Sequence, residues 1–559
     1  MTTPTIERVT GSRGAGPATG AATGALALSR LALRRDRIVL PVWVVGFGLM
    51  MWAVVASVQG LYPTAEERAG AAAFAAGSVV ARAFDGPAAG TSLGALSLME
   101  SYVLLAVLIG LMATFSVVRH TRQNEENGRA ELIGAAVVGR HAILVAAVFV
   151  TLGATSLAGA ATTVVLLAYG LPVVGAVLTG VGLLVVGACF AAVAAVTAQI
   201  FDSSRAANAT AGASVGIAFF LRAIGDAAGD LAASGVEVIS AWPSWLSPIG
   251  WAQQVRPFHL DRVAPLALGV AFAVALFALA AGLATRRDAG SGMLGTRPGP
   301  ARGQRHLLSP LGLAWRLQRG VALGWFSGIV ALAASFAALG DEAGEFITTS
   351  EQLADAFAVM AAGADLVDTF LGFMMALIGT VTGGFIVQVL LRLRTEEASG
   401  TLEPLLSTAI SRSRWLASHA TIAVVGVVVI LLSAGVAAGI SYGLVSGDVP
   451  AALATLTPAA LVHLPASFTL IGIVIIGFAV VPRWAAGVAW TAFVVCLLMG
   501  QIGALLELPQ AVLNVSPYTH TPAIPAVELT WMPLVALSAV AAGLVVLGAA
   551  WFRRRDLSL

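Results

Sequence analysis

The sequence predicts an all-α polytopic membrane protein in which two six-helix repeats follow one another along the chain. Of the 559 residues, 58% are hydrophobic and only 11% are charged, and one polar motif occurs twice. Soluble domains carry roughly 25% charged residues. A run of about 20 apolar residues crosses a bilayer as a helix, and the chain offers about twelve such runs. Little length therefore remains for a large soluble domain.

The recurring motif is a polar segment that follows the second apolar run of each half. Five of its residues return at one spacing, since 394 minus 122 and the four other differences are all 272. The pairs are Arg122 with Arg394, Glu125 with Glu397, Gly128 with Gly400, Glu131 with Glu403 and Arg140 with Arg412. So many polar matches are not expected by chance in such an apolar chain. We infer an internal duplication.

Composition divides the chain into four parts. Residues 1–25, rich in Thr, Gly and Ala, are expected to form a disordered cytoplasmic tail. Residues 26–285 hold the first repeat, 286–310 a cytoplasmic linker and 311–559 the second repeat. A basic amphipathic helix is predicted before the first span of each repeat. The predicted spans are 38–60, 96–118, 142–168, 173–198, 206–224, 264–284, 320–340, 367–391, 415–445, 452–480, 484–504 and 532–551.

The distribution of arginine predicts that both termini are cytoplasmic. With the N-terminus inside, the inner segments hold 26 of the 31 basic residues, and the outer segments hold most of the acids. Basic residues concentrate on the cytoplasmic side of membrane proteins. Because each half has an even number of spans, the halves insert in the same direction and form parallel repeats. The two recurring motifs then both lie on the cytoplasmic face.

Several chemistries lack the residues that they need. The chain contains no Lys, so the phosphate-binding loop GxxxxGK[ST] cannot occur, and no nucleic-acid partner is expected. The seven His show no metal-binding spacing, and Cys189 and Cys496 lie in apolar runs. We therefore expect no catalytic site, no metal site and no cofactor bound by this chain. An integral membrane enzyme would need clustered polar groups that the sequence does not show.

Each motif is expected to contain a short polar helix. In the second copy, Gly400 ends the helix that leaves the membrane, Thr401 is predicted to cap the next one, and Glu403 falls in its first turn. The first copy lacks the hydroxyl cap, so its helix is expected to be less well defined. A pair of charged turns beside the membrane is the alternative to a docking surface, and the recurrence favours docking.

The chain resembles the membrane subunits of ABC type-2 transporters. The resemblance is carried by Arg-x-x-Glu-x-x-Gly-x-x-Glu after the second span, by the basic helix before the first, and by late Ser-Pro pairs at Ser247 and Ser516. The double-length form is similar to actinobacterial exporters of polyketide antibiotics, including tetronasin-type resistance permeases. This implies a permease of the bacterial cell membrane that exports lipophilic antibiotics or drugs.

The same resemblance implies a separate ATPase subunit, two copies per permease, which binds ATP and Mg. Its docking surface would be the two cytoplasmic coupling helices. The candidate coupling residues are Arg122, Glu125, Gly128, Glu131, Arg394, Glu397, Gly400, Thr401 and Glu403.

A substrate path is predicted along the second and eighth spans, where Met and aromatic side chains could form an adaptable apolar wall. The candidates are Met99, Tyr102, Met112, Phe115, Phe370, Phe373, Met374 and Met375. Contact with lipid or packing between helices is the favoured alternative for each residue taken singly.

Three further alternatives stay open. An ion-coupled multidrug antiporter would need ionisable groups at mid-membrane, whereas Glu100 and Asp368 lie near predicted span ends. The polar excursions 226–262 and 507–531 are either re-entrant segments or ordinary outer loops. Arg222 either pairs with Asp226 or extends toward the membrane surface, which we favour.

Glycine pairs such as Gly212 with Gly216 and Gly435 with Gly439 are weak evidence of helix packing.

The topology is testable by cysteine labelling. Single cysteines at positions 235 and 515 should react with a membrane-impermeant maleimide in intact cells, and one at position 300 should react only after lysis. Labelling of position 300 from outside would contradict the parallel arrangement of six plus six spans.

Overall fold

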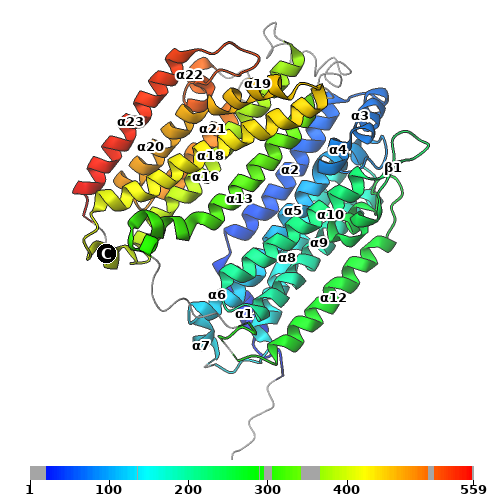
Figure 1. Ribbon diagram of the computed structural model, residues 1–559. Coiled ribbons are helices and arrows are strands. Elements are labelled where there is room, and N and C mark those ends of the chain that lie inside the picture. The colour runs from blue at the N-terminus through cyan, green and yellow to red at the C-terminus, as the bar shows by residue number, and fades with distance from the viewer. Residues whose placement is uncertain are drawn as a thin grey trace, which may run out of the picture. The chain divides into compact units, whose positions relative to one another are not determined.

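The computed structural model describes residues 20–134, 136–288, 290–294, 305–340, 365–501 and 509–556. The chain divides into two compact units, unit 1 from Met1 to Pro298 and unit 2 from Gly299 to Leu559, so the boundary falls inside the predicted linker. The predicted tail as far as residue 19 and linker residues 295–304 lie outside the described residues. Long helices dominate both units, which confirms the all-α membrane fold (Figure 1).

Unit 1 contains a bundle of long helices with short elements at both ends. Its elements are α1 (Ala25–Arg35), α2 (Val39–Leu61), α3 (Ala65–Gly77), α4 (Val79–Phe84), α5 (Leu93–His120), α6 (Arg122–Glu126), α7 (Arg129–Gly134), α8 (Ala142–Ala168), α9 (Val173–Ile200), α10 (Ser204–Ala227), β1 (Asp230–Leu231), β2 (Val238–Ile239), the 3-10 helix η1 (Trp242–Leu246), α11 (Pro248–Gln253) and α12 (Ala264–Ala284). The strands β1 and β2 form a small antiparallel hairpin.

Unit 2 repeats the order of long helices. Its elements are η2 (Arg305–Leu308), α13 (Pro310–Ala338), α16 (Leu366–Ala398), α17 (Leu402–Leu406), α18 (Arg412–Ser446), α19 (Val449–Leu461), α20 (Leu464–Val480), α21 (Ala485–Gln501), α22 (Gln510–Leu513), η3 (Pro517–His520) and α23 (Trp531–Arg554).

Eleven helical segments among the described residues are long and apolar enough to span a membrane, six in unit 1 and five in unit 2. The predicted span 484–504 corresponds to α21, which is shorter than the others. The predicted spans 142–168 and 264–284 match α8 and α12 to the residue. The predicted span 452–480 is interrupted at Val462 and His463, next to the prolines at positions 458 and 465.

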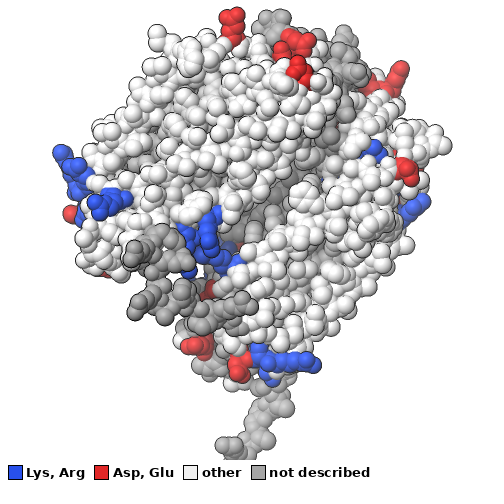
Figure 2. Space-filling view, viewed as in Figure 1, with Lys and Arg blue, Asp and Glu red and all other residues white. Residues whose placement is uncertain are grey.

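The second span of each unit lies at its centre. Within the candidate spans, 72% of the apolar window is buried for α5 and for α16, against 17% for α2 and for α23. Leu105 and Ile109 of α5 are fully buried, as are Phe385 and Ile386 of α16. On the face shown in Figure 2, charged side chains are sparse and wide surfaces without Lys, Arg, Asp or Glu separate them, as lipid contact requires. The motifs therefore extend from the most central helix of each unit.

Small residues allow close helix contacts at particular positions. A Cβ atom on Gly435 or Gly439 would lie 2.8 Å from backbone atoms of α19, so this pair does mark a helix interface. A Cβ atom on Gly212 or Gly216 would have nothing within 4 Å, so the same spacing marks no contact there. The spacing alone thus does not distinguish the two pairs.

The predicted basic amphipathic helices differ between the units. In unit 1, α1 is separate from α2, and Asp36 between them pairs with Arg119 at 3.0 Å and with His120 at 2.7 Å. In unit 2 the corresponding segment is the first part of α13, which runs unbroken from Pro310 into the span.

The excursion 226–262 is a packed cap rather than an ordinary loop. Ser247 accepts hydrogen bonds from the backbone N–H groups of Ile249 and Gly250 at 3.2 and 3.3 Å and so caps α11. Ile249 is fully buried and belongs to the core around α5 and α9. In unit 2, Tyr518 of η3 is buried and shares a hydrogen bond of 3.1 Å with Ser467. Both excursions therefore pack against their own bundles as capping segments, and their re-entry into the membrane stays a prediction.

Our preference for an extended Arg222 is wrong. Arg222 is fully buried, lies 3.3 Å from the Asp226 carboxylate, and donates to the carbonyl oxygens of Ala83 at 2.8 Å and Phe84 at 3.0 Å. These carbonyl groups end α4, where a cation is favourable. The buried pair therefore joins α4 to α10. An Arg222 side chain extended toward water would lose these contacts.

Replacement of Arg222 by Gln should destabilise unit 1, because removal of one partner from a buried ion pair costs about 3 to 5 kcal/mol. For a unit of this size we expect the apparent melting temperature to fall by roughly 10 °C. The buried thiols of Cys189 and Cys496 permit a melt with a thiol-reactive dye in detergent. Arg262→Gln, at an exposed arginine, is the control and should melt like the parent. Equal melting of both variants would contradict the structural role of the pair.

Candidate coupling site

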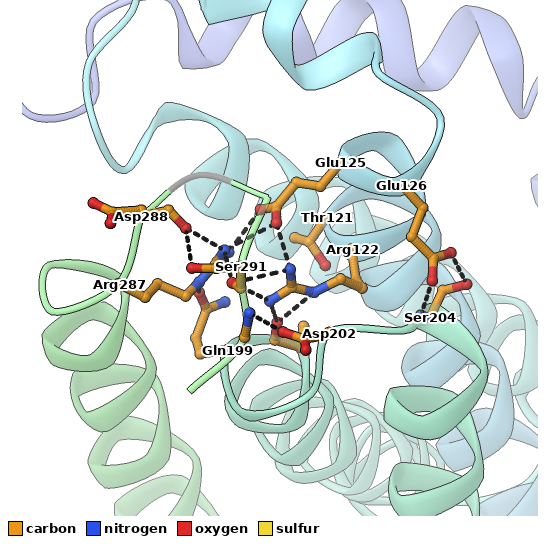
Figure 3. Close-up of polar contacts among 12 residues, drawn as sticks. Thr121, Arg122, Glu125, Glu126, Gln199, Asp202, Ser204, Arg287, Asp288 and Ser291 are labelled. Atoms are coloured by element: carbon orange, nitrogen blue, oxygen red, sulfur yellow. Dashed lines mark hydrogen bonds and ion pairs between the residues drawn. The ribbon is translucent and has the colours of Figure 1, made fainter. Parts of the chain in front are cut away.

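The first motif turns sharply below α5 and returns toward its own bundle. Gly128 adopts a φ of 68°, a conformation that favours glycine, and separates α6 from α7. Arg122 is fully buried and pairs with Glu125 at 2.7 Å. Its guanidinium also donates two hydrogen bonds, of 2.6 and 3.0 Å, to the carbonyl oxygen of Ala198 near the end of α9 (Figure 3). The motif is thus tied to the fourth span.

A second arginine reaches the same carboxylate from the end of the last span of unit 1. Arg287, just after α12, contacts both oxygens of Glu125, at 2.6 and 2.9 Å, and donates to the Gln199 side chain at 2.7 Å (Figure 3). The backbone N–H of Leu294 then donates to the carbonyl oxygen of Ile200 at 2.9 Å. Residues 290–294 therefore cross the end of α9, and Glu125 joins the second, fourth and sixth spans.

The second motif makes equivalent contacts, but the arginine that binds the end of the fourth span is the one after the last span, Arg555. Glu397 is buried, lies 3.7 Å from Arg394 and 2.5 Å from Arg555, which follows α23. Arg555 also donates to the carbonyl oxygen of Phe478 at 2.7 Å, near the end of α20. Its guanidinium lies 5.0 Å from the centre of the Phe478 ring. In unit 2 the arginine after the last span therefore makes the carbonyl contact that Arg122 makes in unit 1.

The arginine at the fifth recurring position binds the C-terminal end of the last span in both units. Arg140 donates to the carbonyl oxygen of Thr285 at 2.6 Å, and Thr285 is the residue that ends α12. Arg412 donates to the carbonyl oxygen of Arg555 at 2.7 Å, and Arg555 is the residue that ends α23. A basic side chain at a helix C-terminus satisfies carbonyl groups that have no partner within the helix. This recurrence is thus structural.

Glu131 and Glu403 differ from the other recurring residues. Both are exposed and both lie in the first turn of a short helix, α7 or α17. Neither carboxylate makes an ion pair or a side-chain hydrogen bond with any of the described residues. Gly400 has a φ of 72°, so it turns the chain before α17 as Gly128 does before α7.

The predicted cap by Thr401 is wrong. A capping residue has extended backbone angles, whereas Thr401 has φ −71° and ψ −17° and makes no side-chain cap bond. Its hydroxyl donates instead to the carbonyl oxygen of Glu396 at 3.1 Å, toward the preceding helix. The expectation of a less well defined first copy stays a prediction; α7 has six residues and α17 has five.

The predicted path residues lie mostly inside the helix packing. Met99, Tyr102, Met112, Met374 and Met375 are buried, and Met112 and Met375 belong to the hydrophobic cores of their units. Phe370 and Phe373 are partly buried against the core of unit 2, and Phe115 is exposed.

Met99 and Tyr102 line one small cavity together with Gln253 and Arg256 of the packed cap. Its volume of about 30 Å³ is far below the ~300 Å³ or more of ligand pockets. The assignment of a substrate path stays a prediction.

Sequence reasoning missed Arg287 and Arg555. Both follow the last apolar run of a half, but their separation is 268 residues, since 555 minus 287 gives 268, and not the 272 of the motif. A search that allowed a shift of four residues could have paired them. Glu125 and Glu397, which the resemblance implies as coupling residues, bind these arginines within their own units. Their contact with an ATPase stays a prediction.

The fold and the site define an integral membrane protein made of two units with the same order of spanning helices. A family model described as "Multidrug efflux system permease Rv1217c, C-terminal domain" matches residues 307–553. The multidrug efflux system permease protein Rv1217c of Mycobacterium tuberculosis is 39% identical over 535 residues, which cover 96% of this chain and 95% of that protein. The chain belongs to this family of multidrug efflux permeases.

The Glu397–Arg555 pair should be energetically coupled. Glu397→Gln and Arg555→Gln should each speed hydrogen exchange of segment 398–408. The double variant should lose less local stability, measured from exchange rates, than the two single losses added together. The expected interaction energy is about 1 to 3 kcal/mol, as for residues of one buried network. Arg554→Gln, at an exposed neighbouring arginine, is the control and should leave exchange unchanged. Additive effects of the two single changes would exclude the proposed tie between motif and last span.

Proposed function

We propose that this chain is the membrane subunit of an ATP-driven exporter of lipophilic drugs, with separate ATPase subunits docked at α7 and α17. Its membership of the multidrug efflux permease family supports a role in drug efflux. The chain has no Lys and so cannot form the phosphate-binding loop GxxxxGK[ST], which supports ATP and Mg being bound by a partner. Two motifs suit two ATPase copies, both on the predicted cytoplasmic face.

The observation that carries this proposal is the exposed pair Glu131 and Glu403. The other recurring positions have a role inside their own unit, as ion pairs, turns or helix ends. These two carboxylates recur at the same spacing, are exposed and have no ion-pair or hydrogen-bond partner among the described residues. Exposed charges of this kind steer and orient a partner surface.

The ion pairs of Glu125 and Glu397, in the same motifs as Glu131 and Glu403, offer a route for coupling. A partner that moves α7 or α17 acts on a motif whose Glu125 or Glu397 is bound to the arginine after the last span. Movement of the motif would therefore be passed to the ends of the fourth and sixth spans rather than absorbed by a free loop.

An ion-coupled antiporter is the second candidate, favoured by Glu100. Because α5 begins at Leu93, Glu100 lies about 10 Å along the helix from its first residue, is exposed, and has no ion pair among those of the described residues. A carboxylate within a span is typical of ion-coupled transport. The energy source separates the two candidates. Vanadate-sensitive efflux that survives a protonophore would support the ATPase, and the reverse result would support the antiporter.

The docking assignment is tested by charge reversal. Glu131→Arg and Glu403→Arg should each lower copurification of vanadate-sensitive ATPase activity by about tenfold or more, because like charges across an interface cost several kcal/mol. The two changes should have similar effects, since neither short helix has the hydroxyl cap that was expected to favour the second. Glu403→Gln should have a smaller effect than the reversal.

Glu528→Arg is the matched control, because Glu528 is exposed and lies in the excursion before α23. Surface expression of every variant should equal that of the parent. Normal ATPase recovery and normal drug efflux in the double charge reversal would contradict docking at these helices.

A further inference from the structure

A groove of about 540 Å³ lies in unit 1 between α1, the motif helices and the first turns of α8. Asp36, paired with Arg119 and His120, holds the end of α1 against the end of α5 and so forms one wall. Ala146 and Ala147 on the opposite wall belong to the first turns of a candidate membrane span. The groove therefore opens where the apolar part of the bundle begins, at the level of a membrane surface.

Three arginines line this groove without a carboxylate partner. Arg34, Arg35 and Arg129 are exposed, and the ion pairs of the described residues include none of them. Arg35 donates one hydrogen bond, of 2.9 Å, to the side-chain oxygen of Asn124. Burial lowers the pKa of Arg35 and the nearby charges of Arg119 and Arg129 lower it further, whereas the Asp36 carboxylate raises it. Because Asp36 is already bound by Arg119 and His120, positive charge is in excess here, which favours an anion.

Apart from His120 and Asn124, the rest of the lining is apolar, and part of it is exposed. Leu31 is 57% exposed and Leu132 is 79% exposed, although both are large hydrophobic side chains. Leu28 and Ile143 extend the same surface toward α8. An apolar lining beside uncompensated arginines matches a ligand that is both anionic and hydrophobic.

We propose that this groove binds an acidic phospholipid of the surrounding membrane. The phosphate lies between Arg34 and Arg129, whose guanidinium groups suit bidentate binding of phosphate oxygens. An acyl chain lies along Leu31 and Leu132 toward Ile143. Basic pockets beside membrane helices bind anionic headgroups in this way. The lipid would stabilise the position of α1 against the motif helices, and the proposal does not depend on the ATPase partner.

The test is native mass spectrometry of the full-length chain titrated with phosphatidylglycerol and, separately, with phosphatidylcholine. The variant Arg34→Gln/Arg129→Gln should bind phosphatidylglycerol more weakly by about fivefold per arginine removed. The control Arg30→Gln/Arg37→Gln removes the same charge from exposed positions around α1 that do not line the groove. Its affinity should stay within about twofold of the parent, and phosphatidylcholine binding should be the same in all three proteins.

A photoreactive group on the acyl chain of phosphatidylglycerol gives a second measurement. It should label segments 25–36 and 129–147 in the parent and lose this labelling in the groove variant. Equal loss of affinity in the groove variant and the control would overturn the proposal in favour of diffuse surface charge. Unchanged lipid binding with loss of ATPase copurification would overturn it in favour of a protein partner at these arginines. Equal affinity of the parent for both lipids would also overturn it.

Discussion

A carboxylate held between two arginines determines how the ends of the spans are arranged in each unit. Arginine at the end of an apolar bundle must be neutralised and hydrogen-bonded, because an unpaired buried charge costs several kcal/mol. Glu125 and Glu397 meet this requirement for Arg287 and Arg555. The remaining donors of the site bind carbonyl groups where α9 and α20 end. One charge cluster therefore joins three spans that are far apart in sequence.

The two units have the same arrangement of contacts, but different arginines make them. In unit 1, Arg122 binds the carbonyl oxygen of Ala198 while Arg287 holds the carboxylate at both oxygens. In unit 2, Arg555 does both, and Arg394 is partly exposed with a longer contact of 3.7 Å. The duplication has preserved the network of contacts more closely than the role of each residue. An arginine that recurs in sequence is thus not evidence of an identical contact.

Much of the fold could be predicted because its signals are local. Apolar runs between charged residues gave the bounds of α8 and α12, and the glycines of both motifs do adopt the left-handed turn. The two errors have different causes, one a partner that is distant in sequence and one a local backbone conformation. The carbonyl oxygen of Ala83 in α4 that binds Arg222 lies 139 residues away, so the local sequence around Arg222 does not reveal it. Thr401 was expected to cap because residue type does not specify backbone angles.

The candidate site separates evidence for folding from evidence for a partner. Recurrence of a polar motif suggests docking by the motif as a whole, yet most of its positions bind residues of their own unit and would recur in any duplicated fold. Only a recurring side chain that the fold does not use calls for an explanation outside the unit. Glu131 and Glu403 satisfy that condition among the described residues, because each is exposed at the start of a short helix that is itself tied to the spans. A partner that binds there would contact recurring side chains that the fold leaves available, and the arginine pairs behind them would pass the movement to the ends of the spans.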